Sequence, residues 1–493
     1  MRTRALMLQG TGSHVGKSLL VAGLCRLFRQ VGVRVAPFKA QNMALNAYVT
    51  RDGGEIGWAQ AVQAEAAGIE PTVEMNPILL KPETRGSQVI VHGKVWATLA
   101  PAEYYRRRDE LWGAVEASYR RLAAAHELVI IEGAGSPAEP NLMAHDLANM
   151  AVARLARAPV LLVGEIDRGG VFAALLGTLT ILPPADRRRV KGFVINKFRG
   201  DPGLLAPAIR FLQTRSRRPV LGVVPYLQDL RLPEEDSVAL EGPSPREGRS
   251  VAVVRLPYIA NFTDFDPLAL EPGATVRYIH RPDELAGAGL VLLPGSKDTL
   301  ADIRWLKASG FAEALGRHVE AGGALGGICG GYQMLGLRVE DPEGFEGGGS
   351  EDGLGLLPLI TTLAREKITR RVRARLAAAG PAFEAYEIHL GRTEATEPLP
   401  PFAVIEEGGR PRPDGGVRPD GRVWGTYLHG LFDAGSVRRG ILARHAGRAV
   451  PATPAPDYRE LREQEYDRLT EALRSALDLP ALFALAGLSA GGA

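Results

Sequence analysis

One cysteine lies in a sequence setting that would expose it as a nucleophile. Cys329 stands in the segment Gly327–Gly331, after an apolar stretch and before residues that can begin a helix. Small neighbours permit a tight strand–turn–helix elbow, in which the nucleophile is exposed and the following N–H faces a developing oxyanion. An isolated cysteine is more often a buried structural residue. The glycines nevertheless favour a catalytic thiol at Cys329 and an oxyanion donor at Gly330, whereas Cys25, among leucines, keeps the structural interpretation.

A thiolate nucleophile requires a base within hydrogen-bond reach. His429 follows an apolar stretch well after Cys329 in the chain, an order that resembles class I glutamine amidotransferases. Most members of that class place a glutamate two residues after the histidine to orient it, whereas this chain has Leu431. Either another carboxylate, such as Asp433, orients His429, or the pair of residues works alone. The resemblance also implies that Gly295 supplies a second oxyanion N–H.

A further histidine, His389, alternates with Glu387 on a predicted strand. A structural histidine with satisfied hydrogen bonds is the more common situation. Contact with a substrate is the alternative, and the sequence leaves both interpretations open.

A second chemical motif, a phosphate-binding loop, is predicted near the start of the chain. Glycines let backbone N–H groups surround phosphate oxygens, while a lysine adds charge and a hydroxyl can bind Mg²⁺. The strict spacing would place glycine at the position of Thr11, and the first glycine, Gly10, comes one residue earlier. The predicted nucleotide-binding residues of this loop are Gly10, Thr11, Gly12, Gly16, Lys17 and Ser18.

The one-residue offset resembles the loop of dethiobiotin synthetase and its relatives, which make acyl phosphates or carbamates from ATP. The resemblance implies that an acidic residue after a later strand binds the metal, and Glu132 occupies that place. Mg²⁺ prefers oxygen ligands and needs few from the protein, so Ser18 and Glu132 are the first candidates. Glu55 is a second candidate, with helix capping as its alternative. Asn196 matches the position that contacts the base in these relatives.

Strand and helix patterns predict the elements that would position both motifs. The first ~230 residues alternate between short apolar strands and helical segments, as in a parallel sheet covered on both faces. We expect an α/β protein with two doubly wound parallel-sheet domains, first phosphate-loop NTPase-like and then class I glutamine amidotransferase-like, followed by a short helical tail. The strands predicted in the first domain are 5–9, 34–38, 128–132, 159–165, 190–196 and 219–224.

Composition shifts suggest the domain boundaries. We assign residues 1–231 to an ATP-binding amide synthase domain and residues 251–441 to the amidotransferase domain. Residues 232–250, rich in Pro, Glu, Gly and Ser, are predicted to be a linker. Residues 442–493 form the predicted tail, whose apolar residues at helical spacing are Tyr466, Leu469, Leu473 and Leu477.

Overall composition excludes several classes of protein. The chain has 493 residues, 45% of them hydrophobic, and a net charge of +3 without a concentrated basic stripe, which argues against a nucleic-acid binder. No apolar run approaches the ~20 residues of a membrane span. The chain begins almost directly with a predicted strand, which leaves no room for a signal sequence, and its two cysteines do not suggest a disulfide scaffold. We therefore expect a cytoplasmic protein that binds neither membrane nor nucleic acid; its oligomeric state is not predicted.

Several stretches together resemble the cobyric acid synthase family of glutamine-hydrolysing corrin amidotransferases, over nearly the whole chain. This resemblance implies amidation of the b, d, e and g carboxylates of adenosylcobyrinic acid a,c-diamide, with glutamine as nitrogen donor and ATP consumed at each step. It fits a fusion of a carboxylate-activating site and an ammonia-releasing site. The stretches are Phe38–Asn46, Asn76–Pro82, Asp167–Phe172, Asn261–Pro267 and Tyr386–His389.

A polycarboxylate substrate requires cationic and amide-donating contacts. Each candidate could equally be a surface or structural residue. The candidates for binding the corrin are Lys39, Asn42, Lys81, Arg85, Ser87, Gln88 and Arg168.

Two other functions compete with this one. The sister enzyme, cobyrinic acid a,c-diamide synthase, shares the two-domain plan, and the Asp167–Phe172 and Asn42–Asn46 stretches favour the first interpretation. A non-enzymatic phosphate-loop ATPase switch is a rival of a different class. Such a switch has no use for an elbow cysteine paired with a histidine.

Overall fold

The computed structural model describes residues 4–83, 86–228, 230–233, 250–272, 274–378, 380–407, 410–445 and 456–489. Contacts divide the chain into two compact units. The first unit comprises Met1–Ala44, Gly54–Pro233 and Arg462–Ala493, and the second comprises Leu45–Gly53 and Glu234–Leu461. The predicted linker lies almost entirely outside the described residues. None of the helices within the described ranges combines the length and apolar character needed to cross a bilayer.

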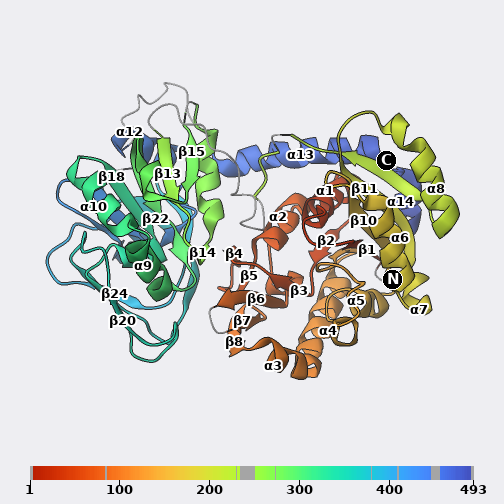
Figure 1. The fold of residues 1–493 in the computed structure, drawn as a ribbon, viewed down its shortest axis with the longest axis horizontal. Coiled ribbons are helices and arrows are strands. Elements are labelled where there is room, and N and C mark those ends of the chain that lie inside the picture. The colour runs from red at the N-terminus through yellow and green to blue at the C-terminus, as the bar shows by residue number, and fades with distance from the viewer. Residues whose placement is uncertain are drawn as a thin grey trace. The chain divides into compact units, whose positions relative to one another are not determined.

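The first unit is built on a six-stranded parallel sheet in the order β12-β11-β10-β1-β9-β2 (Figure 1). Its strands are near-continuous apolar runs because helices shield the sheet from solvent. All six strands expected in this part of the sequence are present. Their bounds are β1 (Arg4–Gly10), β2 (Val35–Phe38), β9 (Leu128–Glu132), β10 (Val160–Glu165), β11 (Val190–Phe198) and β12 (Val220–Pro225).

Helices of the first unit connect these strands. In Figure 1 the longest of them in residues 1–233, α4, lies below the sheet. They are α1 (Lys17–Gln30), α2 (Trp58–Ala67), α3 (Pro101–Arg106), α4 (Arg108–Ala125), α5 (Met150–Ala156), α6 (Val171–Ile181), α7 (Pro184–Arg187) and α8 (Ala206–Ser216).

A smaller sheet, which the sequence did not predict, lies between β2 and α3 in the chain. Its order is β3-β6-β7-β8, with β3 parallel to β6 and the other pairs antiparallel. It carries four of the residues proposed to bind substrate. The bounds are β3 (Gln41–Met43), β6 (Ile78–Glu83), β7 (Gly86–Val91) and β8 (Lys94–Leu99), and the short strand β5 (Glu55–Gly57) precedes α2.

The second unit also contains a six-stranded sheet, in the order β15-β13-β16-β18-β28-β27. All pairs are parallel except β27 with β28. The strands are β13 (Ser250–Val254), β15 (Val276–Ile279), β16 (Ala288–Leu293), β18 (Ala324–Ile328), β27 (Gly416–Val417) and β28 (Val423–Thr426). The helices are α9 (Thr299–Ala308), α10 (Phe311–Glu320), α11 (Gly330–Met334) and α12 (Gly435–His445).

Antiparallel strands complete the second unit. The sheet β26-β25-β22-β23-β29 ends on β29, which directly follows β28 of the parallel sheet in the chain. Its strands are β22 (Ile368–Leu376), β23 (Phe383–His389), β25 (Ala403–Glu407), β26 (Arg410–Asp414) and β29 (Leu428–His429). A second sheet, β20-β19-β21-β24, comprises β19 (Arg338–Asp341), β20 (Gly349–Asp352), β21 (Leu359–Thr362) and β24 (Arg392–Ala395). The pair β14 (Ile259–Ala260) and β17 (Gly295–Ser296) is separate.

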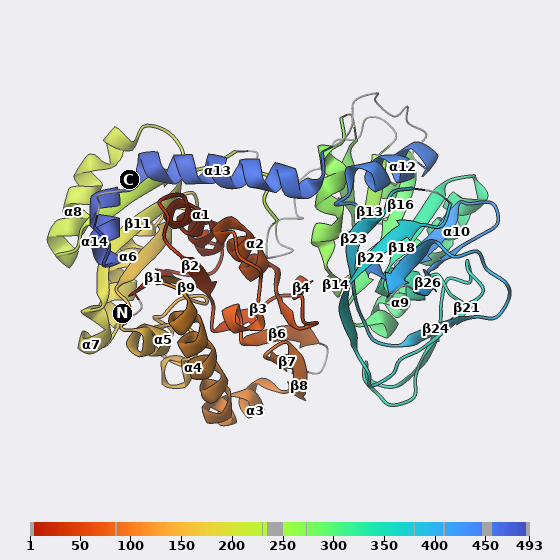
Figure 2. The same ribbon diagram turned by 180° about the vertical axis from the view of Figure 1, so that it is seen from behind.

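The C-terminal helices α13 (Tyr458–Ala476) and α14 (Leu479–Leu485) pack on the first unit from Arg462 onward. In Figure 2 the blue helix α13 runs next to α1. Leu473 packs directly against the backbone of Gly23 in α1. A Cβ on Gly23 would lie 2.4 Å from the leucine methyl. Arg462 and Tyr466 both donate hydrogen bonds to the Glu65 carboxylate in α2. The tail is therefore an integral part of this unit.

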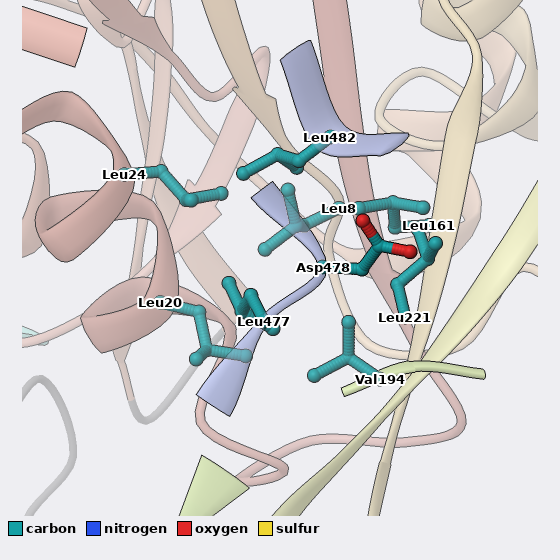
Figure 3. A pocket seen from close by; sticks show the side chains of 9 residues that line it. All are labelled: Leu8, Leu20, Leu24, Leu161, Val194, Leu221, Leu477, Asp478 and Leu482. Atoms are coloured by element: carbon teal, nitrogen blue, oxygen red, sulfur yellow. The ribbon is translucent and has the colours of Figure 1, made fainter. Parts of the chain in front are cut away.

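One pocket of the first unit is lined mainly by leucines. Figure 3 shows Leu477 and Leu482 of the tail facing Leu8 and Leu20, with Asp478 as the charged side chain at the pocket. Its apolar lining makes it a packing defect beside the tail and not a binding site for charged substrates.

Shortening one buried leucine of the tail tests this packing. Leu473→Ala should lower the free energy of unfolding of the first unit by about 2–5 kcal/mol, because a fully buried side chain is removed and a cavity is left. Urea unfolding followed by circular dichroism would measure it. Arg474→Ala, which removes an exposed hydrogen bond to Gln30, is the matched control and should change stability by less than about 0.5 kcal/mol. Equal effects of the two changes would contradict the packing described.

Candidate active site

The thiol elbow is built by the end of β18 and the start of α11. Cys329 has φ 54° and ψ −112°, a backbone conformation that costs a non-glycine residue about 1–3 kcal/mol. The surroundings impose it: the Cys329 N–H donates to the Thr426 carbonyl at 2.9 Å. A Cβ on Gly331 would lie 2.2 Å from the Leu293 carbonyl oxygen, and one on Gly327 would lie 2.6 Å from the Gly331 carbonyl oxygen. The small residues around the cysteine are therefore required by the close approach of backbone to backbone.

The imidazole of His429 is fixed by a carboxylate that the sequence did not reveal. His429 Nδ1 donates to Asp264 Oδ2 at 2.6 Å, and Asp264 Oδ1 accepts from the Gly430 N–H at 3.0 Å. Asp264 lies in the 3₁₀ helix η5 (Phe262–Leu270). On β23, paired with β29, Tyr386 stacks on the imidazole with ring centroids 5.1 Å apart and an interplanar angle of 15°. These contacts set the orientation of the ring.

Electrostatics favour a charged imidazole. Burial lowers the pKa of His429, but the Asp264 charge and hydrogen bond outweigh it, Cys329 acts in the same direction, and the pKa rises from an ordinary 6.5 to about 10. His429 is then an imidazolium at neutral pH. An adjacent cation favours the thiolate form of a cysteine. In its protonated form, the Cys329 thiol donates to the Ile388 carbonyl at 3.4 Å.

The two predicted oxyanion donors lie beside these groups. A Cβ on Gly295 would be 3.5 Å from His429 Cε1 and 3.0 Å from the Ala260 carbonyl oxygen. A Cβ on Gly330 would be 2.8 Å from the Ser296 nitrogen. Strand β17 therefore runs along the elbow, with glycine where it approaches the imidazole most closely.

A buried carboxylic acid holds that strand. Ser296 Oγ donates to Asp302 Oδ2 at 2.6 Å, and the Tyr258 N–H donates to Asp302 Oδ1 at 3.2 Å. Burial raises the pKa of Asp302 to about 7, with nearby Asp298 adding to the rise and the two hydrogen bonds opposing it. Asp302 is therefore largely protonated below neutral pH.

His389 is buried near the thiol. It directly follows Ile388, whose carbonyl accepts a hydrogen bond from Cys329. Its ring stacks on Tyr427 with centroids 3.7 Å apart, and its Nε2 lies 3.8 Å from Glu387 Oε1, beyond hydrogen-bond length. Burial lowers the pKa of His389, and Glu387 opposes that shift. Glu387 itself is held by Arg370 and Arg412, each at 2.6 Å. The structural and substrate-contact interpretations of His389 both stay open.

Sequence reasoning missed Asp264, although it quoted the stretch Asn261–Pro267. The carboxylate at His429 is Asp264, not Asp433, and Leu431 is a buried apolar residue. A residue 165 positions before its partner leaves no spacing signal. The only sign was an acidic residue in a motif to which no role had been assigned.

In the first unit the loop between β1 and α1 is shaped by the end of β11. Gly16, at φ 90°, precedes α1, and Asn196 Nδ2 donates to the Val15 carbonyl at 2.8 Å. A Cβ on Gly16 would lie 2.2 Å from that amide nitrogen. Lys17 Nζ donates to the Gly12 carbonyl at 2.8 Å. Asn196, predicted to contact the base, thus supports the loop; base contact stays a prediction.

The candidate metal ligands Ser18 and Glu132 are in contact. Ser18 Oγ donates to Glu132 Oε1 at 2.9 Å, Gln63 donates to Oε2 at 2.6 Å, and Lys39 Nζ lies 2.9 Å from Oε1. Burial would raise the pKa of Glu132, but Lys39, the hydrogen bond from Gln63 and the charge of Lys17 outweigh it, so its pKa is lowered. A charged, buried carboxylate beside a hydroxyl at a helix start suits Mg²⁺, which usually takes one or two carboxylates plus phosphate oxygens. Within the described ranges no cluster of three His, Cys, Asp or Glu residues is suited to a metal.

The remaining candidates lie on or near the small sheet. Glu55, the second metal candidate, forms a buried ion pair with Lys81. Asn42 Nδ2 donates to Gln60 at 2.9 Å. Gln88 stands opposite Lys81 in the β6–β7 register, and Ser87 is its neighbour on β7.

One candidate, Arg168, is not brought to this group. Arg168 is exposed and lies 3.6 Å from Glu165. Arg85 lies outside the described residues. The roles of all the residues proposed to bind substrate stay predictions.

Comparisons with known proteins match both halves of the chain. The model of the CobB/CobQ-like glutamine amidotransferase domain matches residues 250–437, and that of the CobQ/CobB/MinD/ParA nucleotide binding domain matches residues 6–239. A cobyric acid synthase of Sorangium cellulosum is 51% identical, covering 99% of both chains. One of Pelotomaculum thermopropionicum is 50% identical, covering 98% of this chain and 97% of its own. One of Chloroflexus aggregans is 54% identical, covering 90% and 91%. The predicted α/β architecture and order of the two halves are confirmed.

Replacing the carboxylate at the imidazole tests the electrostatic argument. Asp264→Asn removes the charge that raises the pKa of His429, so the imidazolium beside Cys329 loses its proton at a lower pH. The rate of Cys329 alkylation by iodoacetamide, measured against pH, should show its midpoint moved upward. Asp433→Asn is the matched control and should leave the midpoint in place. An unmoved midpoint in Asp264→Asn would contradict the role given to this carboxylate.

A second test concerns Asp302. Its folded-state pKa of about 7 exceeds its ordinary 3.8, so between these values the folded protein holds a proton that the unfolded chain lacks. Stability should then fall as pH rises through this window, by up to about 1.4 kcal/mol per pH unit. Asp302→Asn should remove this dependence. Thermal midpoints of both proteins at pH 5 and pH 8 would measure it, and parallel pH profiles would refute it.

Proposed function

This chain belongs to the cobyric acid synthase family, and we propose that it amidates the b, d, e and g carboxylates of adenosylcobyrinic acid a,c-diamide, with glutamine and ATP. The family is that of glutamine-hydrolysing carbon–nitrogen ligases of cobalamin biosynthesis. The observation that carries the proposal for this chain is the buried group of Cys329, His429 and Asp264, with Gly295 and Gly330 beside it. A phosphate loop in the same polypeptide supplies the second requirement of an amide synthase.

The thiol site is suited to release ammonia from glutamine. The Cys329 thiolate attacks the carboxamide carbon, and the N–H groups of Gly295 and Gly330 stabilise the oxyanion that forms. The His429 imidazolium gives its proton to the departing nitrogen. Ammonia leaves, and the glutamyl group stays bound to Cys329 as a thioester. His429 then accepts a proton from water as the water attacks the thioester, and glutamate is released. Asp264 keeps Nε2 of the imidazole directed at the reacting groups in each step.

The phosphate loop is suited to activate the acceptor carboxylate. Bound Mg·ATP would supply the phosphoryl group that turns a carboxylate into an acyl phosphate with a good leaving group. The backbone of the loop and Lys17 would hold the phosphates, and Ser18 with Glu132 would hold Mg²⁺. Lys39 would release Glu132 to the metal and face the negative charge of the reacting groups. Ammonia then displaces phosphate, which completes the amide.

Four carboxylates of one substrate must reach this single site. We propose that the corrin leaves and rebinds in a rotated orientation between amidations. Lys81, Asn42 and Gln88 on the small sheet are the favoured contacts for its carboxylates and amides. Partly amidated corrins free in solution during turnover would support this, and their complete absence would contradict it.

Location is a further expectation. Use of ATP and only two cysteines fit a cytoplasmic enzyme.

The product defines the function. Incubation with ATP, Mg²⁺, glutamine and the a,c-diamide corrin should give a product whose mass corresponds to four carboxylate-to-amide conversions. Cobyrinic acid should be offered in parallel, because conversion of that substrate alone would identify the sister activity. ATP turnover without any amide product would favour the nucleotide switch.

Cys329→Ala separates the two half-reactions. The variant should lose glutamine-dependent synthesis entirely and retain synthesis from free ammonia, because only the nucleophile is removed. Cys25→Ala is the matched control: Cys25 is fully buried in α1, burial raises the pKa of its thiol, and its removal should leave both activities. Glutamine-dependent synthesis by Cys329→Ala would disprove the assignment.

A further inference from the structure

A short segment within the nucleotide-binding half of the sequence belongs structurally to the amidotransferase unit. Residues Leu45–Gly53, which we call the strap, lie in the chain between β3 and β5 of the first unit but are part of the second. The strap contains β4 (Ala47–Val49). Asn46 and Ala47 are completely buried, and Val49 is 1% exposed. Such burial of a connecting segment requires that its polar groups find partners.

The strap bonds to the start of the 3₁₀ helix that carries Asp264. Asn46 Oδ1 accepts from the N–H of Phe262, the first residue of η5, which has no partner inside that helix. Asn261, the preceding residue, adopts the left-handed conformation at φ 52°. Its side chain bonds the Ala47 backbone twice, accepting from N–H at 3.3 Å and donating to the carbonyl at 3.2 Å. The Asp264 N–H in turn donates to the Asn261 carbonyl at 3.1 Å.

Asn261 also reaches the imidazole by a second route. Its Nδ2 donates to the Tyr386 hydroxyl at 3.0 Å, and the ring of Tyr386 stacks on that of His429. The strap therefore bonds to the residue that positions both the carboxylate partner and the stacking partner of the base.

The far end of the strap is fixed to β22. Arg371 Nε donates to the Val49 carbonyl at 2.9 Å, and its guanidinium lies 4.9 Å from the centre of the Tyr48 ring. Gly53 approaches so closely that a Cβ there would lie 2.8 Å from the Thr369 carbonyl oxygen. The strap is thus held at both ends, with Asn46 and Ala47 placed against η5.

We propose that the strap is a positioning element of the thiol site, with Asn46 and Asn261 as positioning residues that hold Asp264 and Tyr386 against His429. The proposal rests on the glutaminase role proposed above. It makes a segment encoded within the synthase half a working part of the glutamine-hydrolysing site.

The test uses the full-length protein with Asn46→Ala. Glutamate release should fall at least tenfold, mainly in kcat, while ammonia-dependent amidation stays within twofold of the original. The midpoint of Cys329 alkylation should move to higher pH, as in Asp264→Asn, and combining the two changes should give less than the sum of their effects because both act through one carboxylate. Asn46→Ser keeps an oxygen acceptor for the Phe262 N–H and should restore most of the loss.

Controls make the outcome decisive. Asp52→Ala changes a strap residue whose carboxylate accepts from Thr50 within the strap itself, and it should alter neither readout. If Asn46→Ala does not fold, Asn261→Asp, which tolerates the left-handed backbone and keeps one bond to Ala47, should show the same alkylation shift. Unshifted alkylation with normal glutamate release in either variant would overturn the proposal. Absence of glutamine-dependent synthesis in the original protein would refute the proposed function instead, and alkylation would still test the strap.

Discussion

The hydrogen-bonded ion pair between Asp264 and His429 is the interaction on which the second unit is organised. A charged imidazole that is 1% exposed would be prohibitively unstable without a carboxylate at 2.6 Å. The pair in turn constrains its surroundings, because η5 must present the carboxylate and β23 must present a flat ring to the imidazole. Cys329, with its strained backbone, belongs to the same arrangement, since it is one of the groups that raise the pKa of His429.

Buried carboxylates of the first unit obey the same electrostatic rule. Glu132 is 1% exposed and is matched by Lys39, as Glu55 is matched by Lys81. Each of these buried carboxylates has a lysine as its partner of opposite charge. Removing one member of such a pair leaves the other as an unpaired charge in a poorly solvated site. In both halves, therefore, these buried charged groups are paired with groups of opposite charge.

The phosphate loop and the cysteine elbow were predictable because local backbone geometry requires particular residues there. Contacts between residues far apart in the sequence were not predictable. Gly16 and Gly331 have to be glycine because backbone or amide groups approach them, and that requirement appears directly in the sequence. The six parallel strands of the first unit were equally visible as short apolar runs. The role of Asp264 was not visible, because the fold brings it to His429 and no sequence spacing marks the pair. The sheet β3-β6-β7-β8 was missed for a related reason: its strands mix polar and apolar residues, and β6 contains a proline.

The course of the chain through the two units has a consequence for how such a protein can be divided. A gene cut at residue 250 would send Asn46 to one product and Phe262 to the other, so the second product would begin folding with an uncapped η5. The helix from Arg462 onward would be separated from Glu65 by the same cut. Each half thus carries a piece that the other needs, and fission into two polypeptides would require those pieces to be replaced first. The interleaving of the two units in the sequence therefore favours a single polypeptide.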